Sequence, residues 1–186
     1  MPVRPASIPT GYRVAVVISH AERVPKRRGI TYRSARTADA DEIAAVWSVA
    51  NRARGASVND VHVDIVRGRI SEAAAVGKVA EEEGRIVGMA ILSPAREDRG
   101  QGDPVPGLAH LNTVAVIPDR WGQGIARAIL KLIVEHARGI GYTELQLYVD
   151  ADNERARRLY ELDGWTATGE AVHAFDAALL RYTRAT

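Results

Sequence analysis

A glycine-containing turn between an apolar run and an amphipathic stretch constrains the fold more than any other part of the sequence. Residues 108–117 are mostly apolar and predict a strand, residues 118–124 predict a turn, and residues 125–138 predict a helix with one apolar face. Gly122 and Gly124 lie in the turn, just before the predicted helix begins. Such a turn leaves backbone N–H groups without partners at the positive end of the helix dipole, which favours an anion such as phosphate. The segment therefore predicts a layered fold with an anion site between a strand and a helix.

Strand and helix signals alternate along the rest of the chain. Further strands are predicted over residues 30–35, 78–82, 85–92, 143–149, 165–168 and 174–183, with a hairpin through Glu83-Gly84. Further helices are predicted from Asp39 or Asp41 through Ala50, over residues 61–74, and from Asp150 or Asp152 to Leu162. Residues 94–107 are rich in proline and glycine and are expected to form a loop. The order indicates an α+β or mixed α/β layered fold.

The composition is that of a folded chain without thiol chemistry. Of the 186 residues, 46% are hydrophobic and 26% are charged, which excludes a largely disordered protein. The absence of cysteine excludes disulfides, thiolate metal sites and cysteine nucleophiles. The sequence has no run of about 18 apolar residues, so no membrane-spanning helix is expected. It also lacks the pattern of a secretion signal, so a cytoplasmic location is expected. Residues 1–28, with a short strand predicted over residues 14–18, are interpreted as an extension, and residues 29–186 as one domain.

Charged residues give little support to a nucleic-acid or metal-binding role. The net charge is only +2, and few aromatic residues are interleaved with the arginines, so a basic RNA- or ribosome-associated protein is disfavoured. The histidines show no spacing typical of metal ligands, and no metal site is predicted.

A second motif follows the predicted strand over residues 143–149. On a helix, Asn153, Ala156 and Tyr160 would lie within about 60° of one another, whereas Arg155 and Arg158 would point away from that face. A small residue between an amide and a phenol leaves room for a ligand to dock. The face therefore predicts a second part of a binding site.

Together the two motifs resemble the GCN5-related N-acetyltransferase (GNAT) superfamily. Residues 121–126 (Trp-Gly-Gln-Gly-Ile-Ala) are similar to its acetyl-CoA motif, Arg/Gln-x-x-Gly-x-Gly/Ala, with Trp121 in the place of Arg or Gln. Residues 153–165 are similar to its later motif, Asn-x-x-Ala-x-x-Leu-Tyr-Glu-x-x-Gly-Phe, with Trp165 in the last position. The resemblance implies a central mixed sheet, mostly antiparallel, with splayed parallel central strands and helices on both faces.

The resemblance also implies acetyl-CoA as a co-substrate and assigns residues to it. Backbone groups around Val114, Ala115 and Val116 are expected to bind the pantetheine arm, as are Asn153 and Ala156 beside it. The pyrophosphate is expected on the turn and the first helical residues: Trp121, Gly122, Gln123, Gly124, Ile125, Ala126 and Arg127. Arg120 or Arg127 is expected to supply the charge that Trp121 lacks.

Two residues are candidates for proton transfer. An alkylammonium has a pKa of about 10, so the acceptor amine must lose a proton before it attacks. His110, with an ordinary pKa of about 6.5, is the candidate base, directly or through water, at a place where family members often carry Glu. Its other interpretation is a structural histidine. The resemblance makes Tyr160 the candidate acid for the leaving thiolate, and a backbone N–H near Val116 the candidate for polarising the thioester carbonyl.

These expectations combine into one main function and one alternative. The main prediction is an N-acetyltransferase that transfers an acetyl group from acetyl-CoA to a primary amine of a small molecule or peptide, directly within a ternary complex. The alternative is an acetyl-CoA-binding sensor or partner module with weak turnover. The acceptor site is expected to form from the first helix pair and residues 94–107, and a homodimer is suggested by the resemblance alone.

Overall fold

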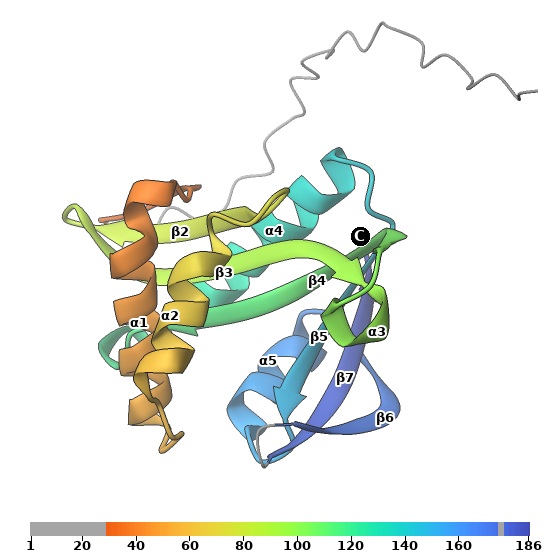
Figure 1. Cartoon of the computed structure of the whole chain (residues 1–186). Helices are drawn as coiled ribbons and strands as arrows, with labels where there is room; N and C mark the ends of the chain where they lie inside the picture. The colour runs from red at the N-terminus through yellow and green to blue at the C-terminus, as the bar shows by residue number, and fades with distance from the viewer. Residues whose placement is uncertain (1–28, 175–176) are drawn as a thin grey trace, which may run out of the picture.

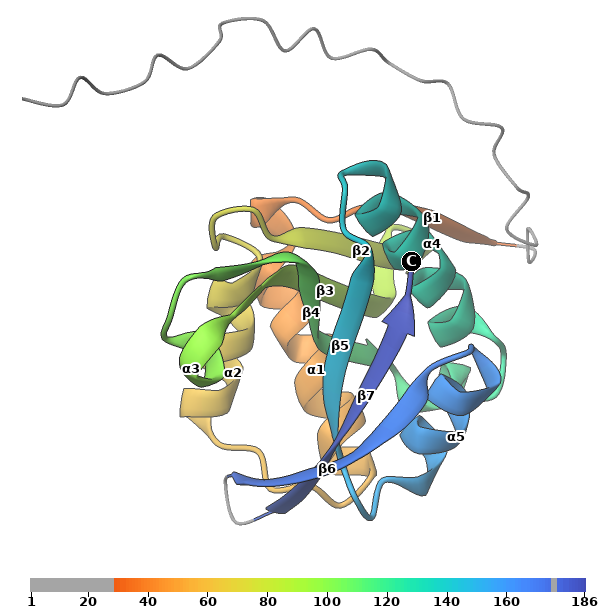
Figure 2. The same ribbon diagram turned by 90° about the vertical axis from the view of Figure 1, so that its right-hand side faces the viewer.

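The strands of the described residues form one seven-stranded sheet with helices on both faces (Figures 1 and 2). A computed structural model describes residues 29–174 and 177–186, so the predicted extension over residues 1–28 and its strand over residues 14–18 lie outside the described residues. The strands are β1 (Ile30–Ser34), β2 (Val76–Glu82), β3 (Arg85–Arg96), β4 (Pro104–Val116), β5 (Glu144–Asp150), β6 (Thr166–Ala174) and β7 (Ala177–Ala185). The helices are α1 (Ala40–Ala53), α2 (Asp60–Arg69), α3 (Glu97–Gly100), α4 (Ile125–Gly139) and α5 (Glu154–Leu162), with 3₁₀ turns η1 (Thr37–Asp39) and η2 (Pro118–Arg120).

The sheet order is β1-β2-β3-β4-β5-β7-β6, and β4 and β5 are its parallel neighbours. They pair only where Leu108–His110 face Glu144–Gln146, after which the two strands part. On the other side of β4, Ile91 faces Thr113 while Leu92 faces Leu111, which leaves Asn112 as the extra residue of a bulge. A bulge bends a strand and increases its twist, which turns the end of β4 away from β5. The predicted mixed, mostly antiparallel sheet with splayed central strands is confirmed.

Each face of the sheet has its own apolar core. The face under α4 and α5 buries Ile125, Ile129 and Ile133 of α4 against Leu145 and Leu147 of β5. The face under α1 and α2 buries Ile43, Val46 and Ala50 of α1, at the spacing that predicted this helix, against Met89 and Ile91 of β3. Within the described residues, no helix is both long and apolar enough to cross a membrane.

The predicted loop over residues 94–107 is wrong at both ends, over half of its length. Strand β3 continues to Arg96 and β4 begins at Pro104, so only residues 97–103 connect them. Proline is acceptable in both strands because it falls where one strand edge has no partner. Pro94 lies beyond the last residue of β3 that pairs with β2, and Pro104 lies before the first residue of β4 that pairs with β5. Strand pairing thus overrides the local turn signal.

Two helix ends also differ from prediction. Helix α2 stops at Arg69 instead of reaching Ala74, which has a positive φ of 60° and cannot continue a right-handed helix. Helix α4 includes Gly139, and the left-handed residue that follows its end is Gly141, with φ 98°. Glycine therefore ends α4, but two residues later than predicted.

Candidate active site

The turn that precedes α4 presents a run of unpaired backbone donors. Gly122 and Gly124 have φ of 73° and 77°, a conformation in which a side chain is strained. The first backbone hydrogen bond of the helix is donated by Ala128 to Gly124 (3.0 Å). Among the described residues, no backbone N–H group of residues 122–127 donates a hydrogen bond, and no side chain caps the helix. A Cβ at Gly122 would meet nothing within 4 Å, so no other described residue covers that side of the turn.

Trp121 fixes this turn to the end of β4. Its indole Nε1 donates to the carbonyl of Val116 at 2.6 Å. The guanidinium of Arg155, in the first turn of α5, lies 4.4 Å from the centroid of the Trp121 ring. This is a cation–π contact, and it brings a positive charge to the turn. The helical pattern alone placed Arg155 away from the ligand face, because only the folded chain brings α5 against the turn.

The arginines expected to supply charge at the turn have other partners. Arg120 pairs with Glu82 at 2.8 Å, across the end of the β2–β3 hairpin. Arg127 is two-thirds exposed and lies 3.8 Å from Asp163. Arg155 is therefore the arginine that contacts the tryptophan at the motif's first position.

The end of β4 directs backbone groups into the opening beside β5. Ile117 donates its N–H to the carbonyl of Val87 (3.0 Å), and Val116 faces Gly88 in the register. Val116 and Gly88 therefore form a non-hydrogen-bonded pair, in which the amide and carbonyl of Val116 point away from β3. Val114, two residues earlier, has the same orientation. Ala115 is buried on the opposite face, against the α1 core.

Asn153 caps α5, a role predicted for Asp150 or Asp152. Its side-chain oxygen accepts a hydrogen bond from the N–H of Ala156 at 3.2 Å. Asp150 instead pairs with Arg54 at 2.6 Å. The cap occupies the oxygen of Asn153 and leaves its NH₂ group as a donor. Ala156 is partly buried against the core under α5.

Tyr160 is buried at the junction of α5 and β7. Its ring packs 5.8 Å from Trp165 and 6.3 Å from Tyr182, measured between ring centroids. Burial raises the pKa of the Tyr160 phenol well above its usual value, so the group stays protonated at neutral pH. Its hydroxyl makes no hydrogen bond within the described part of the chain.

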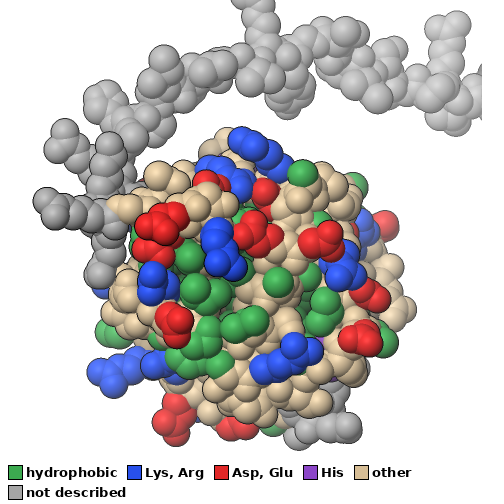
Figure 3. Space-filling model, turned by 90° about the vertical axis from the view of Figure 1, so that its left-hand side faces the viewer, with side chains coloured by type: hydrophobic (Ala, Val, Ile, Leu, Met, Phe, Trp, Pro, Cys, Tyr) green, Lys and Arg blue, Asp and Glu red, His purple; other side chains and the backbone are tan. Residues whose placement is uncertain are grey.

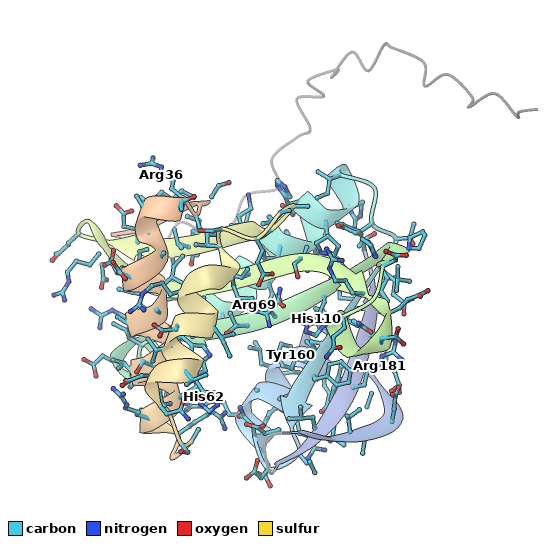
Figure 4. The ribbon with its side chains drawn as sticks, in the orientation of Figure 1. Arg36, His62, Arg69, His110, Tyr160 and Arg181 are labelled. Carbon is cyan, nitrogen blue, oxygen red and sulfur yellow. The ribbon has the colours of Figure 1, made fainter. Side chains whose placement is uncertain are left out.

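His110 is the last residue of β4 that pairs with β5, at the point where these two strands begin to part. Its ring centroid is 5.8 Å from that of Tyr148 on β5, and its Nδ1 is buried without a hydrogen-bond partner among the described residues. Burial and, to a smaller extent, the charge of Arg69 lower the pKa of His110 to about 4. The imidazole is therefore neutral at pH 7 and a weaker base than an ordinary histidine. Figure 4 shows Arg69 and His110 next to each other near this opening.

A separate hollow of about 500 Å³ lies on the α1 side of η2. Its floor is formed by Val46 and Val49 of α1 with Ile86 and Ile117 of the sheet. Figure 3 shows apolar side chains in the middle of this face, surrounded by charged ones. The hollow adjoins η2 but is not the opening between β4 and β5.

Comparison with known proteins adds to this geometry. The model of the family described as "Acetyltransferase (GNAT) family" matches residues 43–165. A mycothiol acetyltransferase of Parafrankia sp. is 36% identical over 91 residues, which is 49% of this chain and 26% of that protein. The chain spans less than half the length of the curated relatives it matches.

Solved structures share the fold at low identity. A GCN5-related N-acetyltransferase from Kribbella flavida has a TM-score of 0.67 at 20% identity, covering 85% of this chain and 98% of that one. The PaiA N-acetyltransferase of Thermoplasma acidophilum, solved in complex with coenzyme A, has a TM-score of 0.62 at 12% identity, covering 82% and 97%. The arrangement of strands and helices is therefore shared with these acetyltransferases.

Proposed function

The chain belongs to the acetyltransferase (GNAT) family, and we propose that it transfers the acetyl group of acetyl-CoA to a primary amine of a small molecule or peptide. The observation that supports this most directly is the run of unpaired N–H groups over residues 122–127 at the start of α4. Backbone donors at a helix N-terminus suit the pyrophosphate of coenzyme A. The acetyltransferase unit is proposed to extend over residues 29–186, since the sheet that builds the site uses strands from Ile30 to Ala185.

In this proposal the protein binds its co-substrate mainly through the backbone. Residues 122–127 hold the pyrophosphate, and Arg155, seated on Trp121, adds positive charge beside it. The amide of Val116 and the backbone of Val114 offer the pantetheine arm the hydrogen bonds of a strand edge. The thioester supplies an activated acetyl group. The chain has no cysteine to accept that group, which supports direct transfer to the amine.

The proposed proton transfers use one neutral base and one protonated acid. His110 is neutral at pH 7 and can take a proton from the amine as the amine attacks, directly or through water. Tyr160 stays protonated because of its burial, so it can donate a proton to the leaving thiolate. The two side chains lie on opposite faces of β5, because Tyr160 belongs to the core under α5 whereas His110 contacts Tyr148.

Calorimetry with acetyl-CoA, combined with a thiol-release assay over a panel of amines, tests the proposal. We expect micromolar or tighter binding and acetyl-CoA-dependent thiol release with at least one class of amine. Binding without release across the panel would instead support the alternative, an acetyl-CoA sensor. Absence of binding would contradict both.

A further inference from the structure

A row of polar side chains crosses the α2 face of the sheet from β4 to β7. His110 contacts Tyr148, and Tyr148 stands directly opposite Arg181 in the antiparallel pairing of β5 with β7. Residues directly opposite each other on paired strands project to the same face. His110, Tyr148 and Arg181 therefore form one row across β4, β5 and β7, on the face where the amine would reach His110.

Arg181 has an unused donor at the end of this row. Its Nη1 donates to a carboxylate oxygen of Glu170, on β6, at 3.0 Å. No other hydrogen bond from the guanidinium occurs among the described residues. Its Nε is buried and has no partner in the part of the chain described. Buried polar atoms in folded proteins are nearly always hydrogen-bonded, so such a donor calls for a partner beyond the described residues. The unused edge of the guanidinium, formed by Nε and Nη2, has the geometry that binds a carboxylate through two parallel hydrogen bonds.

Arginines with acidic partners surround the row. Arg69 of α2 lies close enough to His110 for its charge to act on the imidazole, and its own partner, Glu72, is 3.2 Å away on the helix surface. On the same face of β5, the carboxylate of Asp150 is neutralised by Arg54 at 2.6 Å.

We propose that the acceptor carries a carboxylate next to its amine, as an α-amino acid does, and that Arg181 binds that carboxylate. The inference rests on the proposed acetyltransferase function and names the substrate class of that site. A fully protonated polyamine has no group that can accept a hydrogen bond from Arg181 Nε. An acceptor with a carboxylate is attracted and held with its amine toward His110.

The experiment compares matched acceptors that differ only at the carboxylate. Several α-amino acids are each assayed beside the corresponding amide and the decarboxylated amine, for example phenylalanine, phenylalaninamide and phenethylamine. For wild-type protein we expect kcat/KM to be at least about 10-fold higher for the acids, in line with a charge-assisted bidentate contact. R181Q should lower kcat/KM for the acids by about 10- to 100-fold, mainly through KM, and leave the decarboxylated amines unchanged.

Two further variants separate recognition from folding. R181K keeps the charge but loses the fork, so it should recover part of the preference for the acids. R158Q removes an exposed arginine of α5 and should behave as wild type. Transfer to acids and decarboxylated amines at equal rates, or an R181Q protein with the wild-type preference, overturns the inference alone. Binding of acetyl-CoA without transfer to any acceptor contradicts the proposed function itself.

Discussion

The N-termini of α4 and α5 are built in opposite ways. Helix α4 starts after Gly124, no side chain caps it, and its first N–H groups have no partner among the described residues. Helix α5 starts after Asn153, whose side chain accepts from Ala156. Unpaired donors at a helix end are normally satisfied by a cap, by water or by a ligand. One helix end is thus completed by the chain, whereas the other leaves free the backbone donors that the proposed pyrophosphate site uses.

Burial explains why α4 can do without a cap. Ile125, Ile129 and Ile133 are almost fully buried, and the helix packs so closely on β3 that a Cβ at Gly88 would lie 3.0 Å from Ile125 Cγ2. Fully burying a residue of this kind is worth about 1.5–3 kcal/mol, more than a typical cap. In α5 the buried residue is Tyr160. The shorter, less buried helix therefore depends more on its cap.

The largest expected effect comes from filling the open end of α4. Gly124→Glu should weaken acetyl-CoA binding on the order of 1,000-fold, because a carboxylate would compete with and repel the phosphate groups. Calorimetry measures the affinity. Gly141→Glu is the matched control, since it places the same side chain at a positive φ of 98° beyond the other end of the helix. Wild-type affinity in Gly124→Glu would falsify the anion site.

Tyr160 tests what α5 contributes beyond its capped end. Tyr160→Phe should lower kcat about 100-fold, because general acid catalysis contributes on this scale, while the Kd for acetyl-CoA stays unchanged. Steady-state kinetics and calorimetry together make the measurement. Tyr142→Phe, which changes a tyrosine between α4 and β5, should have little effect on kcat. An unchanged kcat in Tyr160→Phe would remove this residue as the acid.

His110 tests whether the part of the site beside β4 and β5 excludes a buried positive charge. Its pKa is lowered to about 4 by burial and by Arg69, against about 6.5 in the unfolded chain. Between pH 4 and pH 6.5 the unfolded chain binds more protons at this histidine than the folded chain does. The free energy of unfolding therefore has its full value above pH 6.5 and falls as the pH is lowered toward 4.

Between pH 7.5 and 4.5 this corresponds to about 2.5 kcal/mol of unfolding free energy. Urea unfolding of wild type and His110→Gln at both pH values isolates the contribution, because other groups titrate in both proteins. We expect the wild type to lose more stability than the variant. Equal losses would show that His110 is not held neutral by the fold.

The sequence predicted the order of the elements because periodicity and turn residues act locally. Glu83 and Gly84 both have positive φ, at 51° and 77°, and form the predicted hairpin turn. Prolines 94 and 104 misled the prediction, since their fit depends on where neighbouring strands end. Tertiary pairing of this kind has no local signal.

The sequence could predict those residues of the candidate site that belong to one of the two motifs. Gly122, Gly124 and Tyr160 are motif positions, whereas Arg155 occupies a variable position of the second motif and Arg181 lies outside both motifs. Arg155 becomes relevant only through its contact with Trp121, and Arg181 only through its register with Tyr148. The role of Asn153 illustrates the remaining ambiguity, because one amide side chain can cap a helix and also bind a ligand.

Substitutions of Asn153 have the smallest expected effect, and they test most directly the comparison between the N-termini of α4 and α5. Asn153→Ala should cost about 1 kcal/mol of unfolding free energy, because Ala156 N–H loses its acceptor. Asn153→Asp keeps the acceptor and suits the helix dipole, so its stability should equal or slightly exceed that of wild type.

The same Asp variant has no NH₂ group to donate, so it should raise KM for acetyl-CoA only if that group binds the pantetheine arm. Asn59→Ala is the matched control, since Asn59 caps α2 by accepting from His62 N–H at 2.9 Å. It should lose similar stability with no change in KM. If Asn153→Asp keeps both stability and KM, Asn153 is a cap alone, and α5 contacts the co-substrate through Arg155, Ala156 and Tyr160 without it.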